Sequence, residues 1–301
     1  MRARILSGIV ITVLTIVLGI MGGLPLGIVL MFCAMVAYYE LTRALNVHDA
    51  SQGKTNILEI VGLLFTVFYY IALMIESKTY VTMTNVDSVL MRSPEDPMPF
   101  IHHANSLALF VIMAVFLIEM AIYAITFPRF KAEQVLGAIF SFLYAPLMIS
   151  CIYRAEFLPY GLFVFALIFF CSWISDTCAY AVGTLLGRHK MAPILSPHKT
   201  VEGAIGGIAG SIILCLVAAA VIEHLVPGEN LYLPFALIGA VGSIIGIIGD
   251  LAASAIKRNH GLKDYGKAIP GHGGFMDRFD SVIFTAPVIY FLGVIFLTLA
   301  Y

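Results

Sequence analysis

The sequence contains few charged residues. Asp, Glu, Lys and Arg make up 12% of its 301 residues, whereas hydrophobic types make up 60%. Soluble globular domains contain about 25% charged residues. This shortage excludes a soluble globular protein, and no polar interval is long enough to fold alone. We therefore expect a single integral membrane domain over residues 1–301.

Cysteine is also scarce, and it carries no recognisable motif. The five cysteines lie in apolar segments, and none forms a CxxC pair typical of metal sites. Such cysteines behave as small buried hydrophobic residues, so we expect no disulfide. A clear internal repeat is absent as well, and with it one common signature of membrane transporters.

Long apolar runs are abundant. A helix of about 17–25 apolar residues crosses a bilayer. The predicted fold is therefore all-α, a polytopic membrane protein with about nine transmembrane helices. The predicted spans are residues 5–22, 25–42, 57–75, 105–127, 133–152, 160–185, 204–224, 232–254 and 281–300. Arg2 and Arg4 before the first run also fit a signal peptide, but a second run follows directly and favours an uncleaved span.

Positive charge is distributed unevenly between the two sides that alternating spans define. With the N-terminus in the cytoplasm, all but three of the 17 Lys and Arg residues fall on the cytoplasmic side. The three exceptions are Lys78, Arg92 and Arg154. Cytoplasmic loops are enriched in Lys and Arg. We therefore expect this orientation, which places the charged loops 187–203 and 255–280 in the cytoplasm.

The most charged stretch lies between the last two predicted spans. Residues 254–280 read SAIKRNHGLKDYGKAIPGHGGFMDRFD and contain five Lys and Arg residues. Acidic side chains beside basic ones suit a metal ion and a polyphosphate held together. Gly273 and Gly274 let the backbone approach a ligand closely. Asp280 also fits a simpler role, the N-cap of the last span.

An acidic residue in the sixth predicted span and the basic loop after it extend this set. Asp176 lies in an apolar run, where an ionisable side chain is costly and points to function. Pairing with a basic residue for packing is the alternative. Ser196-Pro197 predicts a turn, and Gly203 is expected to open a helix rich in small residues. Lys199 and Thr200 would donate hydrogen bonds to phosphate oxygens near that helix N-terminus.

Asp250 lies near the end of the eighth predicted span. On a continuing helix it shares one face with Ser254, Lys257 and Arg258. The alternative is an ordinary Asp–Lys pair on a helix surface. Its place at a membrane boundary, facing a basic loop, favours a binding site instead.

Together these loops resemble the signature of the phosphatidate cytidylyltransferases, also called CDP-diacylglycerol synthases. The resemblance rests on residues 254–280 and on SPHKTVEG at 196–203, where His198 stands at a position that is Lys in many members. Asp176 also fits the family pattern. The motif-bearing part covers roughly residues 172–281, and the first half is similar only in being hydrophobic and multi-spanning.

The resemblance implies that CTP and phosphatidic acid are converted to CDP-diacylglycerol and pyrophosphate. It implies Mg²⁺, with Mn²⁺ as a substitute and a second cation as an option. It also implies a homodimer in the bacterial inner membrane, with its active site facing the cytoplasm and no nucleic-acid partner. The implied substrates are a cytosolic triphosphate and a membrane lipid, so the resemblance calls for a membrane protein with a charged site at the cytoplasmic interface, as the sequence predicts.

Roles follow for the residues of the two loops. The leading metal ligands are Asp250 and Asp277, with Asp264, Asp280 and Asp176 as further candidates. The catalytic set comprises Asp250, Asp277, Lys199, Lys257 and Arg278. The substrate-binding set comprises Ser196, Thr200, Ser254, Arg258, Lys263, His272, Gly273 and Gly274.

Two alternative functions remain open. A cation-coupled membrane transporter fits the intramembrane Asp176, but transporter sites lie near the bilayer midplane rather than in a loop. A CTP-dependent lipid-alcohol kinase would need a base for a hydroxyl group, and His272 is the only convenient one in the second loop.

Overall fold

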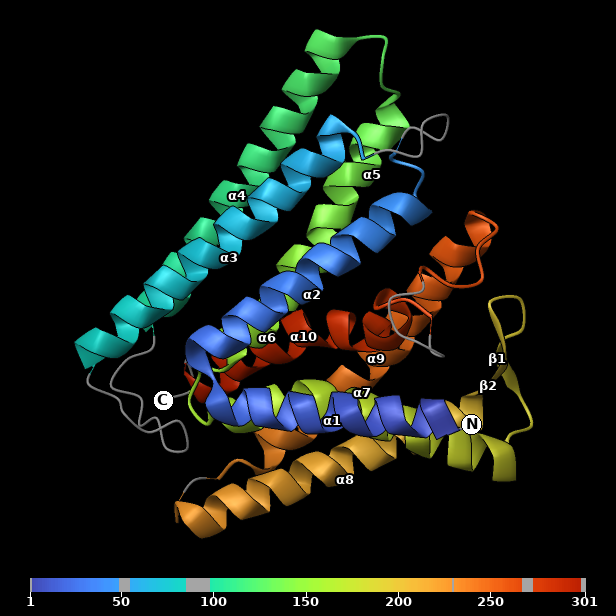
Figure 1. Cartoon of the computed structure of the whole chain (residues 1–301). Coiled ribbons are helices and arrows are strands. Elements are labelled where there is room, and N and C mark those ends of the chain that lie inside the picture. The colour runs from blue at the N-terminus through green and yellow to red at the C-terminus, as the bar shows by residue number, and fades with distance from the viewer. Residues whose placement is uncertain (1, 49–54, 85–97, 229, 267–272, 299–301) are drawn as a thin grey trace.

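The computed structural model describes residues 2–48, 55–84, 98–228, 230–266 and 273–298. Most of these residues lie in helices (Figure 1). In chain order the elements are α1 (Arg2–Met21), α2 (Gly23–Ala44), α3 (Ile57–Thr84), α4 (Met98–Thr126), α5 (Ala132–Phe142), the π-helical turn η1 (Leu143–Leu147), α6 (Met148–Ala155), α7 (Gly161–Leu186), β1 (Lys190–Ala192), β2 (Ser196–Thr200), α8 (Val201–Leu225), α9 (Tyr232–Asn259) and α10 (Met276–Leu297).

The expected all-α polytopic membrane fold is confirmed. Within the described residues, eight helices are long and apolar enough to span a membrane, counting α5, η1 and α6 as one. The first predicted span corresponds to α1, whose apolar part, Gly8–Met21, is shorter. The continuous fifth span contains Pro146, which lacks a backbone N–H. The π-helical turn accommodates it, and the Tyr70 hydroxyl donates to the Pro146 carbonyl at 3.1 Å.

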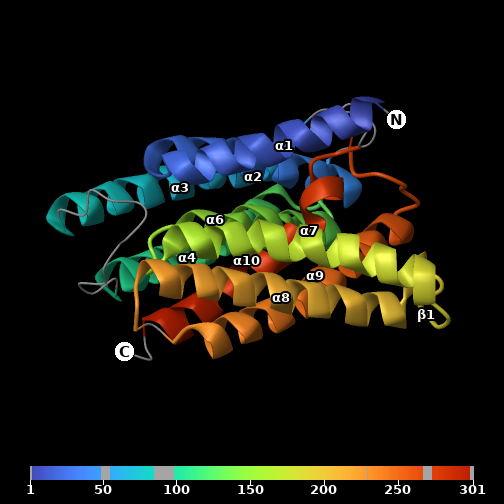
Figure 2. The same ribbon diagram turned by 90° about the horizontal axis from the view of Figure 1, so that it is seen from below.

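Small residues bring the C-terminal helices close together. A Cβ atom added at Gly207 of α8 would lie 2.8 Å from the Ser175 carbonyl oxygen of α7. One added at Gly249 of α9 would lie 3.2 Å from the Asp280 carbonyl oxygen of α10. Close helix approach at small residues is the usual packing mode in membranes. Hydrogen bonds join α7 to the other two helices, between the Ser175 and Ser243 hydroxyls at 2.6 Å and between the Ser172 and Thr285 hydroxyls at 3.1 Å. The acidic residues of α7, α9 and α10 therefore lie on neighbouring helices (Figure 2).

A short antiparallel hairpin stands between α7 and α8. Ser196 pairs with Ala192, so Ser196-Pro197 lies in strand β2, and the predicted turn at that position is wrong. Both strands of a two-stranded sheet are edges, where proline is tolerated. Helix α8 begins at Val201, before the predicted Gly203, because the Thr200 hydroxyl accepts a bond from the Gly203 N–H at 3.1 Å and caps the helix.

Candidate active site

Four carboxylates from three helices line one cavity of about 440 Å³. They are Asp176 of α7, Asp250 of α9, and Asp277 and Asp280 of α10. Arg278 adds a cation to the lining, and Gly8, Ile11 and Thr12 of α1 form a further wall. In Figure 1, α1 crosses in front of α7. The structure therefore gathers acidic residues that are up to about a hundred positions apart in the chain.

The first predicted loop meets helix α9 through Lys199 and Asp250. The Lys199 ammonium of β2 forms an ion pair with the Asp250 carboxylate of α9. The Lys199 and Asp250 side chains are 25% and 29% exposed, so the ion pair is only partly shielded from solvent. Asp176 also borders this region, because it lines a smaller cavity together with Lys199 and Thr200.

Asp277 organises the second loop. Its Oδ1 accepts a hydrogen bond from Lys257 Nζ at 2.8 Å, and its Oδ2 accepts bonds from the N–H groups of Tyr265 and Gly274 at 2.8 and 3.0 Å. The side chains of Lys257 and Asp277 are 12% and 6% exposed. A carboxylate has about four acceptor sites. Asp277 thus keeps limited capacity for a further ligand while it fixes Lys257 in place.

Tyr265 ties the same loop to α9. Its hydroxyl donates to the Ala253 carbonyl at 2.9 Å, and the Lys257 ammonium lies 5.3 Å from the centre of its ring. Burial, reinforced by the Asp280 and Asp277 carboxylates, raises the pKa of Tyr265. The hydroxyl therefore stays neutral and remains a hydrogen-bond donor.

The interpretation of Asp280 as an N-cap is wrong. Helix α10 begins at Met276, so Asp280 lies inside the helix and is 7% exposed. The helix starts before the apolar run because its first turn is bonded by another part of the protein. Glu40 of α2 accepts hydrogen bonds from the Phe275 and Met276 N–H groups at 3.0 and 2.9 Å.

Sequence reasoning missed Glu40. It is 6% exposed, and Cβ atoms added at Gly266 or Gly274 would come within 2.7 Å of its carboxylate oxygens. These two glycines therefore allow the loop backbone to close around the carboxylate. Glu40 interrupts the second predicted apolar span, and the rule that singled out Asp176 would have found it.

We predict that Glu40→Gln weakens both the loop and the activity. A glutamine side chain has one acceptor oxygen, so one buried N–H at the start of α10 would lose its partner. Such a loss costs about 1–3 kcal/mol. Thermal unfolding of the purified protein should show a lower midpoint, and turnover should fall while the KM for CTP rises. Unchanged turnover together with an unchanged midpoint would remove Glu40 from this role.

The remaining predicted residues are distributed around this centre. Ser254 lies one turn after Asp250 and is half-buried, whereas Lys263 and Asp264 are exposed in the loop after α9. Arg258 is exposed and donates to the Leu262 carbonyl at 3.3 Å. Gly273 has a φ of +88°, a conformation that favours glycine. Further members of the set are Ser196, half-buried in β2, and His272, which lies outside the described residues.

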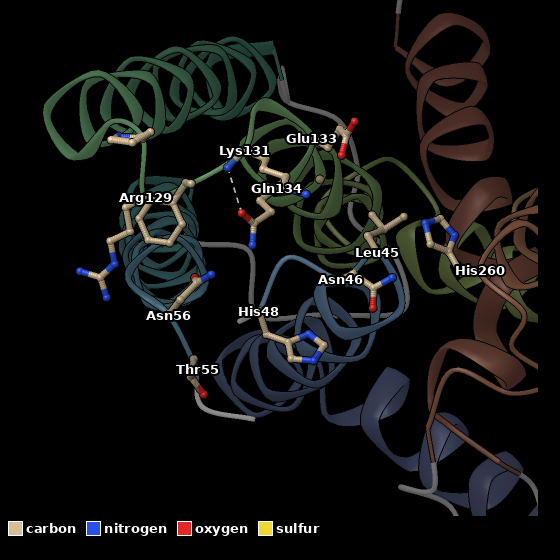
Figure 3. A pocket seen from close by; sticks show the side chains of 13 residues that line it. Leu45, Asn46, His48, Thr55, Asn56, Arg129, Lys131, Glu133, Gln134 and His260 are labelled. Carbon is tan, nitrogen blue, oxygen red and sulfur yellow. Dashed lines mark hydrogen bonds between the residues drawn. The ribbon is translucent and has the colours of Figure 1, made fainter. Parts of the chain in front are cut away.

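A larger cavity of about 680 Å³ lies elsewhere, between the α2–α3 and α4–α5 connections and the end of α9 (Figure 3). Its described lining includes a single carboxylate, that of Glu133. Figure 3 shows His260, the residue after the end of α9, at the edge of this cavity, and the hydrogen bond from the Lys131 N–H to Gln134. It lacks the acidic cluster, so the smaller carboxylate cavity is the better candidate site.

The donor chemistry of the carboxylate cavity fits a divalent cation. Mg²⁺ prefers oxygen ligands and commonly uses one or two carboxylates together with substrate phosphates. Among the described residues, no three acidic, His or Cys side chains converge on one point. The arrangement thus suits an ion shared with a phosphate ligand rather than one enclosed by protein groups alone.

The chain has membrane-spanning helices, and three of them hold acidic and basic side chains around one cavity. This combination is typical of a membrane protein with a binding site for a charged molecule. The model of the Cytidylyltransferase family matches residues 2–296, and the chain belongs to this family. It is therefore a membrane-bound nucleotidyltransferase. The family model covers both halves of the chain, including the first half, where we expected similarity only in hydrophobic, multi-spanning character. Apolar side chains replace one another freely in membrane helices, which hides such similarity in a single sequence.

Curated relatives agree over nearly the full length. The chain is 30% identical to the phosphatidate cytidylyltransferase of Staphylococcus saprophyticus over 295 residues, which cover 97% of this chain and 98% of the relative. It is 29% identical to that of Bacillus subtilis over 297 residues, 98% of both chains. Identity rises to 42% over 142 residues, 47% of both chains, for that of Synechocystis. The comparisons confirm the resemblance and give no support to a transporter or a lipid-alcohol kinase.

Proposed function

We propose that the protein transfers the cytidylyl group of CTP to phosphatidic acid. A phosphate oxygen of the lipid attacks the α-phosphorus of CTP, and a new phosphorus–oxygen bond forms. The bond from the α-phosphorus to the bridging oxygen of the β-phosphate breaks, and pyrophosphate leaves. The observation that carries this proposal is the cavity in which four carboxylates meet Arg278 and the ion pairs of Lys199 and Lys257.

The basic residues would hold the two anionic substrates together. The lipid phosphate is already a nucleophile, so positioning and charge neutralisation account for most of the catalysis. Lys199 and Lys257 are each held by a carboxylate and would meet the triphosphate as cations already in place. Arg278 lines the cavity and would bind the lipid phosphate or the leaving pyrophosphate. Ser254, Thr200, Gly273 and Gly274 would supply polar and backbone contacts around them.

Asp250 and Asp277 would hold Mg²⁺ or Mn²⁺, with Asp176, Asp280 and Asp264 as further ligands or supports. A bound ion would neutralise charge on the phosphate oxygens. Independently of any bound ion, the Asp250 and Asp277 carboxylates hold Lys199 and Lys257 in position beside the cavity. We propose in addition a homodimer and a location in the bacterial inner membrane, with the cavity facing the cytoplasm.

The proposed orientation predicts opposite labelling of two introduced cysteines. Ile194 lies in the β1–β2 connection and is 90% exposed. In intact cells an impermeant thiol reagent should label Tyr301→Cys and leave Ile194→Cys unmodified. Ile194→Cys should react only after the inner face is opened. Labelling of Ile194→Cys from outside, with Tyr301→Cys protected, would reverse the topology.

The position of a radioactive label in CTP separates the candidate reactions. Purified protein is incubated with phosphatidic acid or a lipid alcohol and with CTP labelled at either the α- or the γ-phosphorus. Cytidylyl transfer predicts that only the α-label enters the lipid, and only with phosphatidic acid. Entry of the γ-label into a lipid alcohol would identify a kinase, and no transfer to any lipid would contradict both enzymes.

A further inference from the structure

We propose that an apolar cavity beside the carboxylates holds a segment of one acyl chain of the lipid substrate. The cavity measures about 180 Å³ and lies between α1, α2, α6, α7 and α10. Its lining is almost wholly hydrophobic and includes Leu14, Leu18, Cys33, Phe169 and Phe275. This inference rests on the proposed function, because it assigns a place to the apolar part of phosphatidic acid.

The apolar cavity adjoins the carboxylate cavity. Ile11 of α1 and Phe279 of α10 line both. Phe279 directly precedes Asp280 and stacks on Phe275, with the two ring centres 4.4 Å apart. A ligand that passes from one cavity into the other must be charged at one end and apolar at the other. A lipid phosphate at the carboxylates, with its chain directed past Phe279, meets this requirement.

Helix α1 forms the outer wall of the apolar cavity. Ile11, Leu14, Thr15 and Leu18, spaced as one helical face, point into it. The opposite face of α1 is exposed at Val10, Val13 and Val17, as expected for a helix that contacts bilayer lipid. The cavity is therefore separated from the bilayer by a single helix.

The size of the cavity limits what it can hold. Its volume of about 180 Å³ corresponds to roughly six water molecules at ~30 Å³ each. It thus accommodates a segment of one chain and not a whole diacyl lipid. Because a bilayer interior is as apolar as this lining, the cavity adds little net affinity. Its effect is to orient the lipid, so that the phosphate is held at the carboxylates.

Filling the far end of the cavity tests this assignment. Leu18 lies two turns beyond Ile11 on α1, about 10 Å along the helix at ~1.5 Å per residue. A hexanoyl chain is too short to reach it, whereas an oleoyl chain is not. For Leu18→Trp we expect kcat/KM with dioleoyl-phosphatidic acid to fall about tenfold relative to the dihexanoyl lipid. Cys33→Phe, on α2 across the cavity, should also lower kcat/KM for the dioleoyl lipid relative to the dihexanoyl lipid.

Ile20→Trp is the matched control. It lies on the same helix with a 61% exposed side chain, outside the described linings of both cavities, and should leave the chain-length ratio unchanged. Equal losses with both lipids in Leu18→Trp and Cys33→Phe, or no loss in either, would overturn the assignment. If the wild-type protein used neither lipid, the proposed function itself would be wrong. That outcome is distinct from a wild type that uses both lipids and variants that show no chain-length effect, which would overturn only the cavity assignment.

Photolabelling distinguishes the substrate from an ordinary bilayer lipid. Phosphatidic acid and phosphatidylcholine, each with a diazirine in one acyl chain, are compared in the same vesicles. We expect phosphatidic acid to label residues of α1 and α2 at the cavity preferentially, and unlabelled phosphatidic acid to compete. Equal labelling by both lipids would show that the cavity holds bilayer lipid without selection, which contradicts the proposal.

Discussion

Asp250→Asn and Asp277→Asn should each reduce CDP-diacylglycerol formation by about 100-fold or more, the scale on which loss of one transition-state charge contact acts. At Asp250 the neutral amide would release Lys199 and remove a ligand for a divalent ion. At Asp277 it would release Lys257 and disturb two backbone hydrogen bonds. Activity is measured with purified protein at saturating Mg²⁺ and CTP.

The two variants should differ in stability. Lys257 and Asp277 are nearly buried, and removing one partner of a buried ion pair is strongly destabilising. Lys199 and Asp250 are more exposed, so Asp250→Asn should unfold at nearly the wild-type temperature. Glu133→Gln, an exposed change in the other cavity, serves as the control and should keep full activity. Near-normal turnover by Asp250→Asn would remove this carboxylate from the site.

Lys199→Ala should be as damaging as a change in the second loop. Removing its charge leaves phosphate charge in the transition state less neutralised, at a cost of about 100-fold or more in rate. Lys190 lies in the same hairpin, at the start of β1. Its side chain is exposed and is not among the described residues that line the carboxylate cavity or the smaller cavity at Lys199. Lys190→Ala should therefore lose much less.

CDP-diacylglycerol formation is compared in matched membranes at equal protein level. Active Lys199→Ala together with inactive Lys190→Ala would exclude β2 from the site. The centre would then consist of the second loop and Asp176 alone. A reduced effect of Lys199→Ala in an Asp250→Asn background would show that the two residues act as a pair.

The sequence predicted the spanning helices well, because a long apolar run has few other stable structures. It also identified the acidic residues that share the cavity, since charge is rare and costly in such runs. The start of α10 was not predictable locally. It depends on Glu40, which contacts Phe275 and Met276 across 235 and 236 positions of the chain. The hairpin was also missed. Ser196-Pro197 is compatible with both a turn and an edge strand, and the pairing of Ser196 with Ala192 decides between them.

The most direct measurement is the stoichiometry of the products formed by purified protein from CTP and phosphatidic acid. We expect equal amounts of CDP-diacylglycerol and pyrophosphate from the wild type, and neither above background from Asp250→Asn at the same protein level and unfolding temperature. Equal product formation by folded Asp250→Asn would contradict the carboxylate cavity as the active site. Absence of both products from folded wild-type protein, with CTP, phosphatidic acid and Mg²⁺ present, would contradict the proposed reaction.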